Sequence, residues 1–285
     1  MPISRMIPLS TGLAAHVLEW DAGGDHTVVL VHGFLDLAWG WAPTVDAGLR
    51  GRYHVVAPDL RGHGDSDWVG AGGYYHFLDY LADLEALVAQ VGRARVSLVG
   101  HSMGGGIAAL YAGTWPDRVH KLALLEGTGP PADTSAPPDR VALWVASWRR
   151  ARAKPPRTFA TVAEAVARLC KYDPHLSPEL AAALAEKGTR PLVDGRLVFK
   201  HDPLHGSVDP NPFRLALARS FWERVTCPVL LVDGSLSAFR HAPDEAERRA
   251  RCFRHVTQAV IEGAGHMMQR HRPGEVARVI AELLA

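Results

Sequence analysis

Short runs of apolar residues alternate with longer amphipathic stretches along most of this chain of 285 residues. Each run is short and largely apolar, and the first, residues 27–32, is β-branched and apolar on both faces, as expected of a buried strand. Strands that alternate with helices favour a mostly parallel sheet with helices packed on it. The runs are residues 27–32, 54–59, 96–100, 121–126, 228–233 and 258–261, and the main intervening helices are predicted at 74–91, 103–115 and 273–284.

The alternation stops between residues 127 and 225. This segment is rich in proline, lacks a strongly apolar strand and contains three amphipathic stretches, at residues 140–153, 162–171 and 178–187. We therefore predict a helical cap (lid) at residues 127–225, inserted into an α/β core that consists of residues 1–126 and 226–285.

Ser102 stands at the centre of a G-x-S-x-G pattern between a predicted strand and a predicted helix. A sharp strand-to-helix turn holds the serine backbone in a strained conformation, so the neighbouring residues must be very small. Gly100 and Gly104 meet this requirement. The turn exposes the hydroxyl at a helix N-terminus, where the helix dipole favours developing negative charge. Ser102 is therefore the predicted nucleophile.

A second motif, His32-Gly33-Phe34, directly follows the first buried run. Where a nucleophilic serine sits on such a turn, the loop after that strand supplies one backbone N–H to the oxyanion. The residue after the nucleophile supplies the other. The predicted oxyanion hole therefore consists of the amides of Phe34 and Met103.

Composition limits the partners that this chain is expected to have. The 31 basic and 30 acidic residues nearly balance, which gives no electrostatic reason to expect nucleic acid or an anionic membrane. Three scattered cysteines form no disulfide framework or metal-ligand spacing, and neither a signal peptide nor a membrane-spanning run is recognised. We expect a cytoplasmic protein, and we find no dinucleotide fingerprint, phosphate-binding loop or metal motif that would indicate a cofactor.

Four motifs in order along the chain resemble the α/β-hydrolase superfamily. The resemblance implies an eight-stranded, mostly parallel sheet flanked by helices, with a helical cap inserted after the sixth strand. It also implies a structural rather than metal-binding role for the loop that contains Asp59, His63 and Asp65. Within the superfamily, the stretches 175–189 and 201–202 are similar to serine hydrolase-like proteins. The four motifs lie at residues 32–34, 59–66, 100–105 and 263–266.

His266 is the predicted general base. It lies on a glycine-rich loop between the last predicted strand and the terminal helix, and it comes last in the chain order serine, acid, histidine. A histidine ordinarily has a pKa near neutrality, so it can take the serine proton and return it to the leaving group. Three other histidines, His32, His63 and His101, lie in motifs but look like packing or loop residues.

The acid departs from the pattern of most relatives, which carry it at the fourth position of the turn after the seventh strand. Here that position is Ser237, which cannot stabilise an imidazolium ion by charge. The best replacement is Glu126 at the end of the sixth strand, a position that resembles the acid of some haloalkane dehalogenases. Asp233 is the main rival, and a third possibility is that neither residue serves.

The sequence therefore predicts a cofactor-independent serine hydrolase that cleaves carboxylic esters or related small acyl compounds. Ser102 replaces the carboxylate nucleophile of dehalogenases and epoxide hydrolases, which argues against alkyl-enzyme chemistry. Trp39, Trp144 and Trp148 are candidates for an apolar acyl or aryl pocket, although they could equally form the core of the cap. Three alternatives stay open: hydrolysis of a C–C bond, perhydrolysis with the same triad, and a hydrolase-fold binding protein with idle chemistry. The oligomeric state is not predicted.

Overall fold

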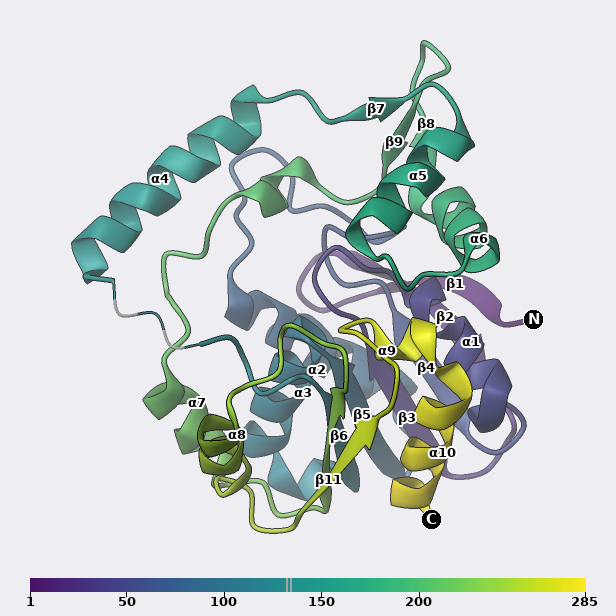
Figure 1. The fold of residues 1–285 in the computed structure, drawn as a ribbon, viewed down its shortest axis with the longest axis vertical. Helices are drawn as coiled ribbons and strands as arrows, with labels where there is room; N and C mark the ends of the chain where they lie inside the picture. Colours follow the sequence, from purple (N-terminus) through teal and green to yellow (C-terminus); the bar gives the residue numbers. More distant parts are fainter. Residues whose placement is uncertain (132, 134) are drawn as a thin grey trace.

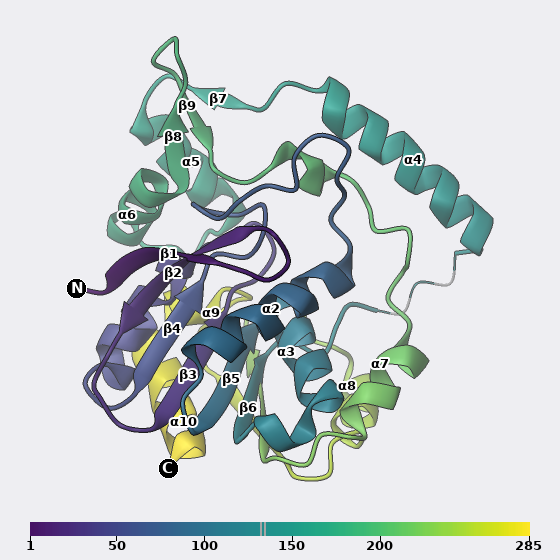
Figure 2. The ribbon, with the colours of Figure 1, turned by 180° about the vertical axis from the view of Figure 1, so that it is seen from behind.

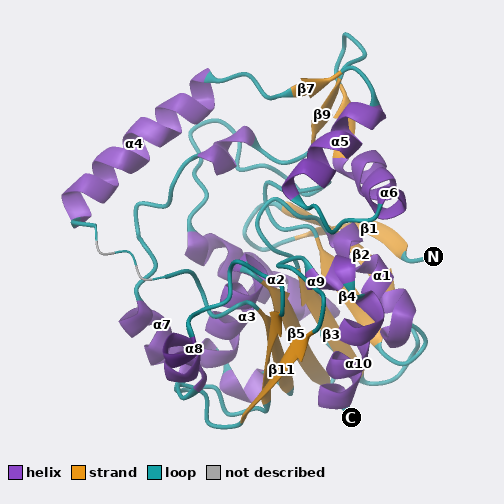
Figure 3. Cartoon of the chain, viewed as in Figure 1, coloured by secondary structure: helices purple, strands orange, loops and turns teal. Residues whose placement is uncertain are grey.

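An eight-stranded sheet forms the centre of the computed structural model, which describes residues 1–131, 133 and 135–285 (Figure 3). Its strands are β1 (Ile3–Pro8), β2 (Ala14–Trp20), β3 (His26–Val31), β4 (His54–Pro58), β5 (Arg95–His101), β6 (Lys121–Leu125), β10 (Val229–Gly234) and β11 (Val256–Ile261). They lie in the order β1-β2-β4-β3-β5-β6-β10-β11, and β2 alone runs antiparallel to its neighbours. The predicted fold class, an α/β sheet of eight mostly parallel strands flanked by helices, is confirmed.

The side chains of the central strands alternate between two apolar layers. In β3, Val29 and Val31 face one layer, whereas Val28 and Leu30 face the other. Because both faces are covered by helices, apolar residues stand at consecutive positions in the middle of these strands. The first layer is completed by α2 (Phe77–Val91), α3 (Met103–Thr114) and α7 (Leu215–Trp222), and the second by α1 (Ala42–Thr44), α9 (Met268–His271) and α10 (Pro273–Leu284) (Figures 1 and 2).

The antiparallel hairpin of β1 and β2 is absent from our sequence-based prediction. β1 is exposed at every position except Ile7, so it lacks the continuous apolar run that marks the central strands. β2 is largely buried, and it pairs with both β1 and β4. None of the helices in the described part of the chain has the length and apolar character that crossing a bilayer requires.

The segment between β6 and β10 rises above the sheet in Figure 1 before it returns to the core. It contains α4 (Pro137–Ala153), β7 (Thr158–Phe159), α5 (Val162–Tyr172), α6 (Pro178–Gly188), β8 (Thr189–Pro191) and β9 (Leu197–Phe199). The three short strands form a separate sheet in the order β7-β9-β8, which the sequence did not predict. The last helix of the segment, α7, packs on α3 and buries Trp222 in the core, beside the region of α8 (Pro243–Ala250).

Candidate active site

Ser102 occupies a sharp turn between the end of β5 and the start of α3. Its backbone angles are φ 52° and ψ −119°, a conformation that residues other than glycine rarely adopt. Two glycines make the turn possible. A Cβ atom on Gly100 would lie 2.4 Å from the carbonyl oxygen of Gly104, and one on Gly104 would lie 2.3 Å from that of Val31. The strand, the turn and the helix therefore pack together too closely for any side chain at these positions.

Glu126 follows β6, the strand next to Ser102. The backbone amide of Ser102 donates to the carbonyl of Leu125 at 2.8 Å, which fixes the two strand ends side by side. Glu126 has a left-handed backbone with φ 45°, and its carboxylate is buried. The carboxylate oxygen Oε2 lies 2.5 Å from Nδ1 of His266. The structure thus brings two of the sequence-predicted site residues into direct contact.

Two further donors hold the Glu126 carboxylate. The amide of Gly234 donates to Oε1 at 3.0 Å, and the hydroxyl of Ser237 donates to Oε2 at 2.8 Å. Burial raises the pKa of Glu126, but the hydrogen bonds from His266, Gly234 and Ser237 outweigh it and leave the pKa below its ordinary value. The carboxylate is therefore held in its charged form.

Asp233 has a different environment. Among the described residues it makes no hydrogen bond to His266. Burial and the negative charge of Glu126 raise its pKa. An aspartate in this environment is a poorer partner for an imidazolium ion than Glu126.

His266 contacts two side chains of the core, one through its ring and one through its backbone carbonyl. Its Nδ1 atom faces Glu126, and its carbonyl oxygen accepts a hydrogen bond of 2.8 Å from Nε2 of His101. Burial and the neighbouring His266 lower the pKa of His101 to about 3, so His101 stays neutral. An imidazole that donates Nδ1–H to a carboxylate has its Nε2 lone pair free to accept a proton.

The loop after β3 lies against the nucleophile. A Cβ atom on Gly33 would come within 3.2 Å of Cβ of Ser102, so this residue must be small for the loop to approach. Phe34 follows on this loop, and Met103 is the first residue of α3. No hydrogen bond from either amide to another described residue is present. These two N–H groups are therefore available to a ligand at Ser102.

The two other histidines near this loop hold the backbone. His32 donates from Nδ1 to the Gly33 carbonyl at 2.7 Å and accepts the Leu60 amide at Nε2. His63 donates from Nδ1 to the Arg61 carbonyl, and its Nε2 accepts a hydrogen bond of 3.2 Å from the Leu35 amide. Burial and the neighbouring His205 hold the pKa of His63 well below its ordinary value.

The tryptophans that the sequence suggested for a pocket are not gathered around His266. Trp144 and Trp148 lie on α4 and pack against Tyr74, with ring centroids 5.2 and 5.7 Å apart. Trp39 packs beside the apolar cluster of the α5–α6 region, under the ammonium group of Lys187. The ring that contacts His266 is Phe239, at 4.3 Å. Sequence reasoning missed Phe239, although it lies only two residues after Ser237.

The Asp59 loop is tied together by its own hydrogen bonds. The Asp59 carboxylate accepts the amides of Ala38 and Asp65 and lies 2.7 Å from Nδ1 of His16. His16, Asp59 and Asp65 lie close together, whereas His63 points to other partners. These contacts join the loop to β2 and to the residues before α1.

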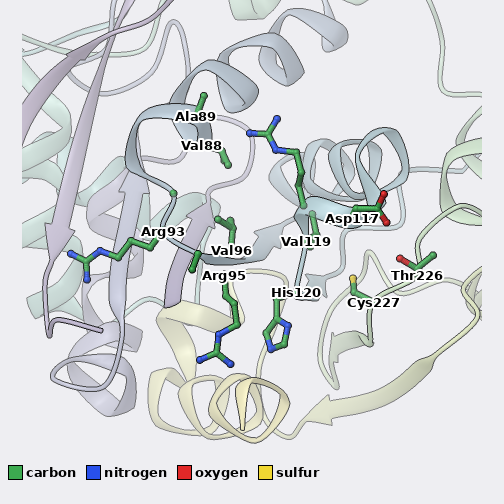
Figure 4. Close-up of a pocket in the computed structure, with 13 residues that line it drawn as sticks. Val88, Ala89, Arg93, Arg95, Val96, Asp117, Val119, His120, Thr226 and Cys227 are labelled. Carbon is green, nitrogen blue, oxygen red and sulfur yellow. The ribbon is translucent and has the colours of Figure 1, made fainter. Parts of the chain in front are cut away.

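A surface cavity of about 530 Å³ lies at the opposite end of the strands from Ser102 (Figure 4). Arg95 at the start of β5, Arg93 and Arg118 are among its lining residues. Each of these arginines forms an ion pair with a carboxylate, at 3.0, 2.7 and 2.5 Å respectively. Because the cavity lies at the opposite end of the strands, it is separate from the candidate active site.

A serine on a strand-to-helix turn, with an imidazole–carboxylate pair at the same edge of a parallel sheet, defines a hydrolase with a nucleophile elbow. The family model described as alpha/beta hydrolase fold matches residues 26–273. The chain belongs to the α/β-hydrolase family.

Two relatives match nearly the whole chain. A serine hydrolase-like protein of Danio rerio is 27% identical over 290 residues, covering 93% of this chain and 83% of that protein. A 3-hydroxybutyrate-oligomer hydrolase of Cupriavidus necator is 30% identical over 280 residues, covering 91% and 89%. Among solved structures, a thioesterase domain from the curacin biosynthetic pathway has a TM-score of 0.86 at 23% identity, covering 99% of both chains. That structure supports the fold, and the first relative agrees with the resemblance seen in the sequence.

Proposed function

We propose that this protein is a serine hydrolase that cleaves carboxylic esters through an acyl-enzyme on Ser102. The observation that carries the proposal is the 2.5 Å contact between Nδ1 of His266 and the buried carboxylate of Glu126, at the strand end beside Ser102. Glu126 takes the part of the acid that Ser237 cannot perform. Ser237 instead donates a hydrogen bond to that acid.

The proposed reaction proceeds in two steps. Ser102 Oγ attacks the ester carbonyl while its proton passes to Nε2 of His266, and Glu126 stabilises the resulting imidazolium ion. The amides of Phe34 and Met103 stabilise the oxyanion of the tetrahedral intermediate. The alcohol leaves with the proton from His266. Water, activated by the same imidazole, then releases the acid from Ser102.

The surroundings of the proposed triad favour an apolar acyl or alcohol group. Phe34 and Leu35 on one loop, and Leu236 and Phe239 on another, are large apolar side chains that are exposed. Exposed apolar side chains near a reactive group commonly mark a binding surface for an apolar ligand. The 30% identical relative carries the name of a hydrolase of hydroxybutyrate oligomers, which is consistent with ester chemistry.

The test is kcat/KM on p-nitrophenyl esters from acetate to decanoate, with Ser102→Ala as the blank. Turnover that depends on Ser102 is expected, and the chain length with the highest kcat/KM will report the size of the pocket. Absence of turnover above the blank would contradict hydrolysis of simple carboxylic esters. Labelling with an organophosphonate would then separate a specialised substrate, for which Ser102 still reacts, from an idle binding protein, for which it does not.

The remaining sequence-based expectations stay predictions. These are a small acyl substrate, action without a cofactor, a cytoplasmic location, and no nucleic-acid or membrane partner. C–C bond hydrolysis and perhydrolysis would use the same residues, and activity on vinylogous diketones or with peroxide would reveal them.

A further inference from the structure

The loop between α5 and α6, residues 173–177, belongs to the segment between β6 and β10 (residues 126–228, here called the cap segment) and reaches the core. Asp173 ends α5, and its Oδ1 atom lies 2.6 Å from Nε2 of His271 at the end of α9. Both side chains are largely buried. A buried charge needs a well-placed partner, so this contact fixes where the loop sits on the core.

The same imidazole holds the loop that carries His266. Nδ1 of His271 accepts the amide of Gly265 at 3.1 Å. Because Nδ1 acts as an acceptor, the proton of His271 is on Nε2 and is donated to Asp173. Two consecutive hydrogen bonds thus connect a carboxylate of the cap segment with the backbone amide of Gly265, the residue before His266.

Packing adds to this connection. A Cβ atom on Gly265 would lie 3.3 Å from Cδ2 of His175 and 3.3 Å from Cε1 of His271, so both rings rest on this glycine. The centroids of the two rings are 5.3 Å apart, and the ring planes are inclined by 65° in an edge-to-face arrangement. His175 comes from the cap segment and His271 from the core. Gly265 is therefore enclosed by side chains from both parts.

Burying Asp173 beside His271 costs free energy that an apolar contact at this place would not cost. The second carboxylate oxygen of Asp173, Oδ2, is buried and has no hydrogen-bond partner among the described residues. Well-packed apolar residues often replace a buried charged or polar pair without loss of stability. An aspartate and a histidine here instead provide a directional link to the Gly265 amide.

We propose that Asp173 and His271 are positioning residues for the catalytic base: the seated cap segment holds the His266 loop in place through Asp173, His271 and the Gly265 amide. The proposal rests on the proposed function, in which His266 is the base. A displacement of about 1 Å at a reacting group can lower a rate on the order of a hundredfold, so a small shift of this loop is sufficient to affect turnover.

The test compares Asp173→Leu, His271→Leu and the double variant, with Asp173→Asn as the conservative replacement. Both single changes to leucine should lower kcat by about tenfold to a hundredfold and change KM little, and the double variant should be no worse than either. Asp173→Asn keeps an oxygen that can accept from Nε2 of His271, so it should retain most of the activity. Thr161→Ala is the matched control, because Thr161 caps the other end of α5. This substitution should lower the Tm without lowering kcat.

A second measurement keeps the proposal separate from the proposed function. The ring nitrogens of His266 and the proton between His266 and Glu126 are observed by NMR in wild type and in Asp173→Leu. Altered resonances together with the fall in kcat support the positioning role. Unaltered resonances, or a kcat that stays constant while the Tm falls, overturn it. If the wild type proves no more active than Ser102→Ala, the proposed function fails, and the NMR comparison alone decides whether the cap segment positions His266.

Discussion

At Glu126 a buried carboxylate is held by three donors of different kinds: an imidazole, a backbone amide and a hydroxyl. Hydrogen bonds to a charged group contribute about 1.5–3 kcal/mol each, which is enough to offset the cost of burying the charge. Two of the donors, Gly234 and Ser237, lie in the turn where most relatives carry the acid itself. In the proposed triad, this turn supports the acid instead of supplying it.

Glu126→Gln should lower kcat by about 10⁴-fold, because an amide cannot stabilise the imidazolium ion and can hold the wrong tautomer of His266. Asp233→Asn is the control, since Asp233 makes no hydrogen bond to His266 among the described residues, and its effect should be less than tenfold. Both are measured by steady-state kinetics on the preferred ester, with circular dichroism to verify folding. The opposite ranking would sink the assignment of Glu126.

A carboxylate at residue 237 should restore part of the activity that Glu126→Gln loses. The Ser237 hydroxyl lies 2.8 Å from the carboxylate oxygen that contacts His266. In the double variant Glu126→Gln, Ser237→Asp, the new carboxylate at residue 237 can therefore approach the imidazole. We expect the double variant to exceed Glu126→Gln in kcat by at least about tenfold, as charge near the imidazolium ion returns. Ser237→Asn in the Glu126→Gln background is the uncharged control. Equal rates for the two double variants would show that charge at this turn does not reach His266.

At the scale of elements, α8 anchors the start of the cap segment. Arg249 on α8 is fully buried and donates to the carbonyls of Thr128, Gly129 and Pro130, while its Nε donates to Glu245. A single guanidinium thus satisfies three successive carbonyls where the chain leaves the sheet.

Arg249→Ala should destabilise the protein by about 3 kcal/mol, because it removes a fully buried side chain together with its hydrogen bonds to three carbonyls and its ion pair with Glu245. It should also speed proteolytic cleavage near residues 127–131. Arg251→Ala is the matched control: this arginine is exposed, and its loss should cost less than about 0.5 kcal/mol. Urea unfolding and limited proteolysis provide the two measurements. Equal stabilities for both variants would show that Arg249 does not anchor this segment.

The elements that sequence could predict are those whose burial imposes a pattern. β3 and β5 are enclosed on both faces, so each contains a run of apolar residues, and the turn at Ser102 admits only glycine at residues 100 and 104. β1 is exposed, and β7 has only two residues, so neither leaves a readable period. In the candidate active site, the order of the motifs along the chain indicated His266, and the absence of a carboxylate at residue 237 indicated Glu126. The donor role of Ser237 and the contact of Phe239 depend on how a loop folds back, which no local pattern records.

At the scale of the whole molecule, the fold buries several histidines in neutral form. Burial lowers the pKa of His101 and of His205 to about 3 and holds that of His63 well below its ordinary value. All three use ring nitrogens in hydrogen bonds that join loops around the candidate active site. On unfolding, each would regain a pKa near 6.5 and bind a proton at mildly acidic pH.

This difference predicts that the protein loses stability as the pH falls below about 6.5. Between that pH and the folded pKa values, the unfolded state binds more protons, so the free energy of unfolding decreases by up to about 1.4 kcal/mol per pH unit for each histidine. Glu126, whose folded pKa is lowered, contributes stability that is present above the ordinary glutamate pKa of 4.5 and is lost only as the pH falls further. The window from pH 6.5 to 5 therefore lies above the pH range in which the contribution of Glu126 is lost. Urea unfolding at pH 8, 6.5, 5.5 and 5, followed by tryptophan fluorescence, measures the slope.

His205→Gln tests the origin of that slope. Its side-chain amide can still donate to the Gly62 carbonyl, as Nε2 of His205 does at 3.1 Å, but it does not titrate. The slope of unfolding free energy against pH should therefore fall by about 1.4 kcal/mol per pH unit, whatever the variant's stability at pH 8. A slope identical to that of wild type would mean that His205 binds its proton in the folded protein too. Acid sensitivity would then have to arise from other groups, and burial at the junction of the cap segment and the Gly62 loop would be weaker than the structure indicates.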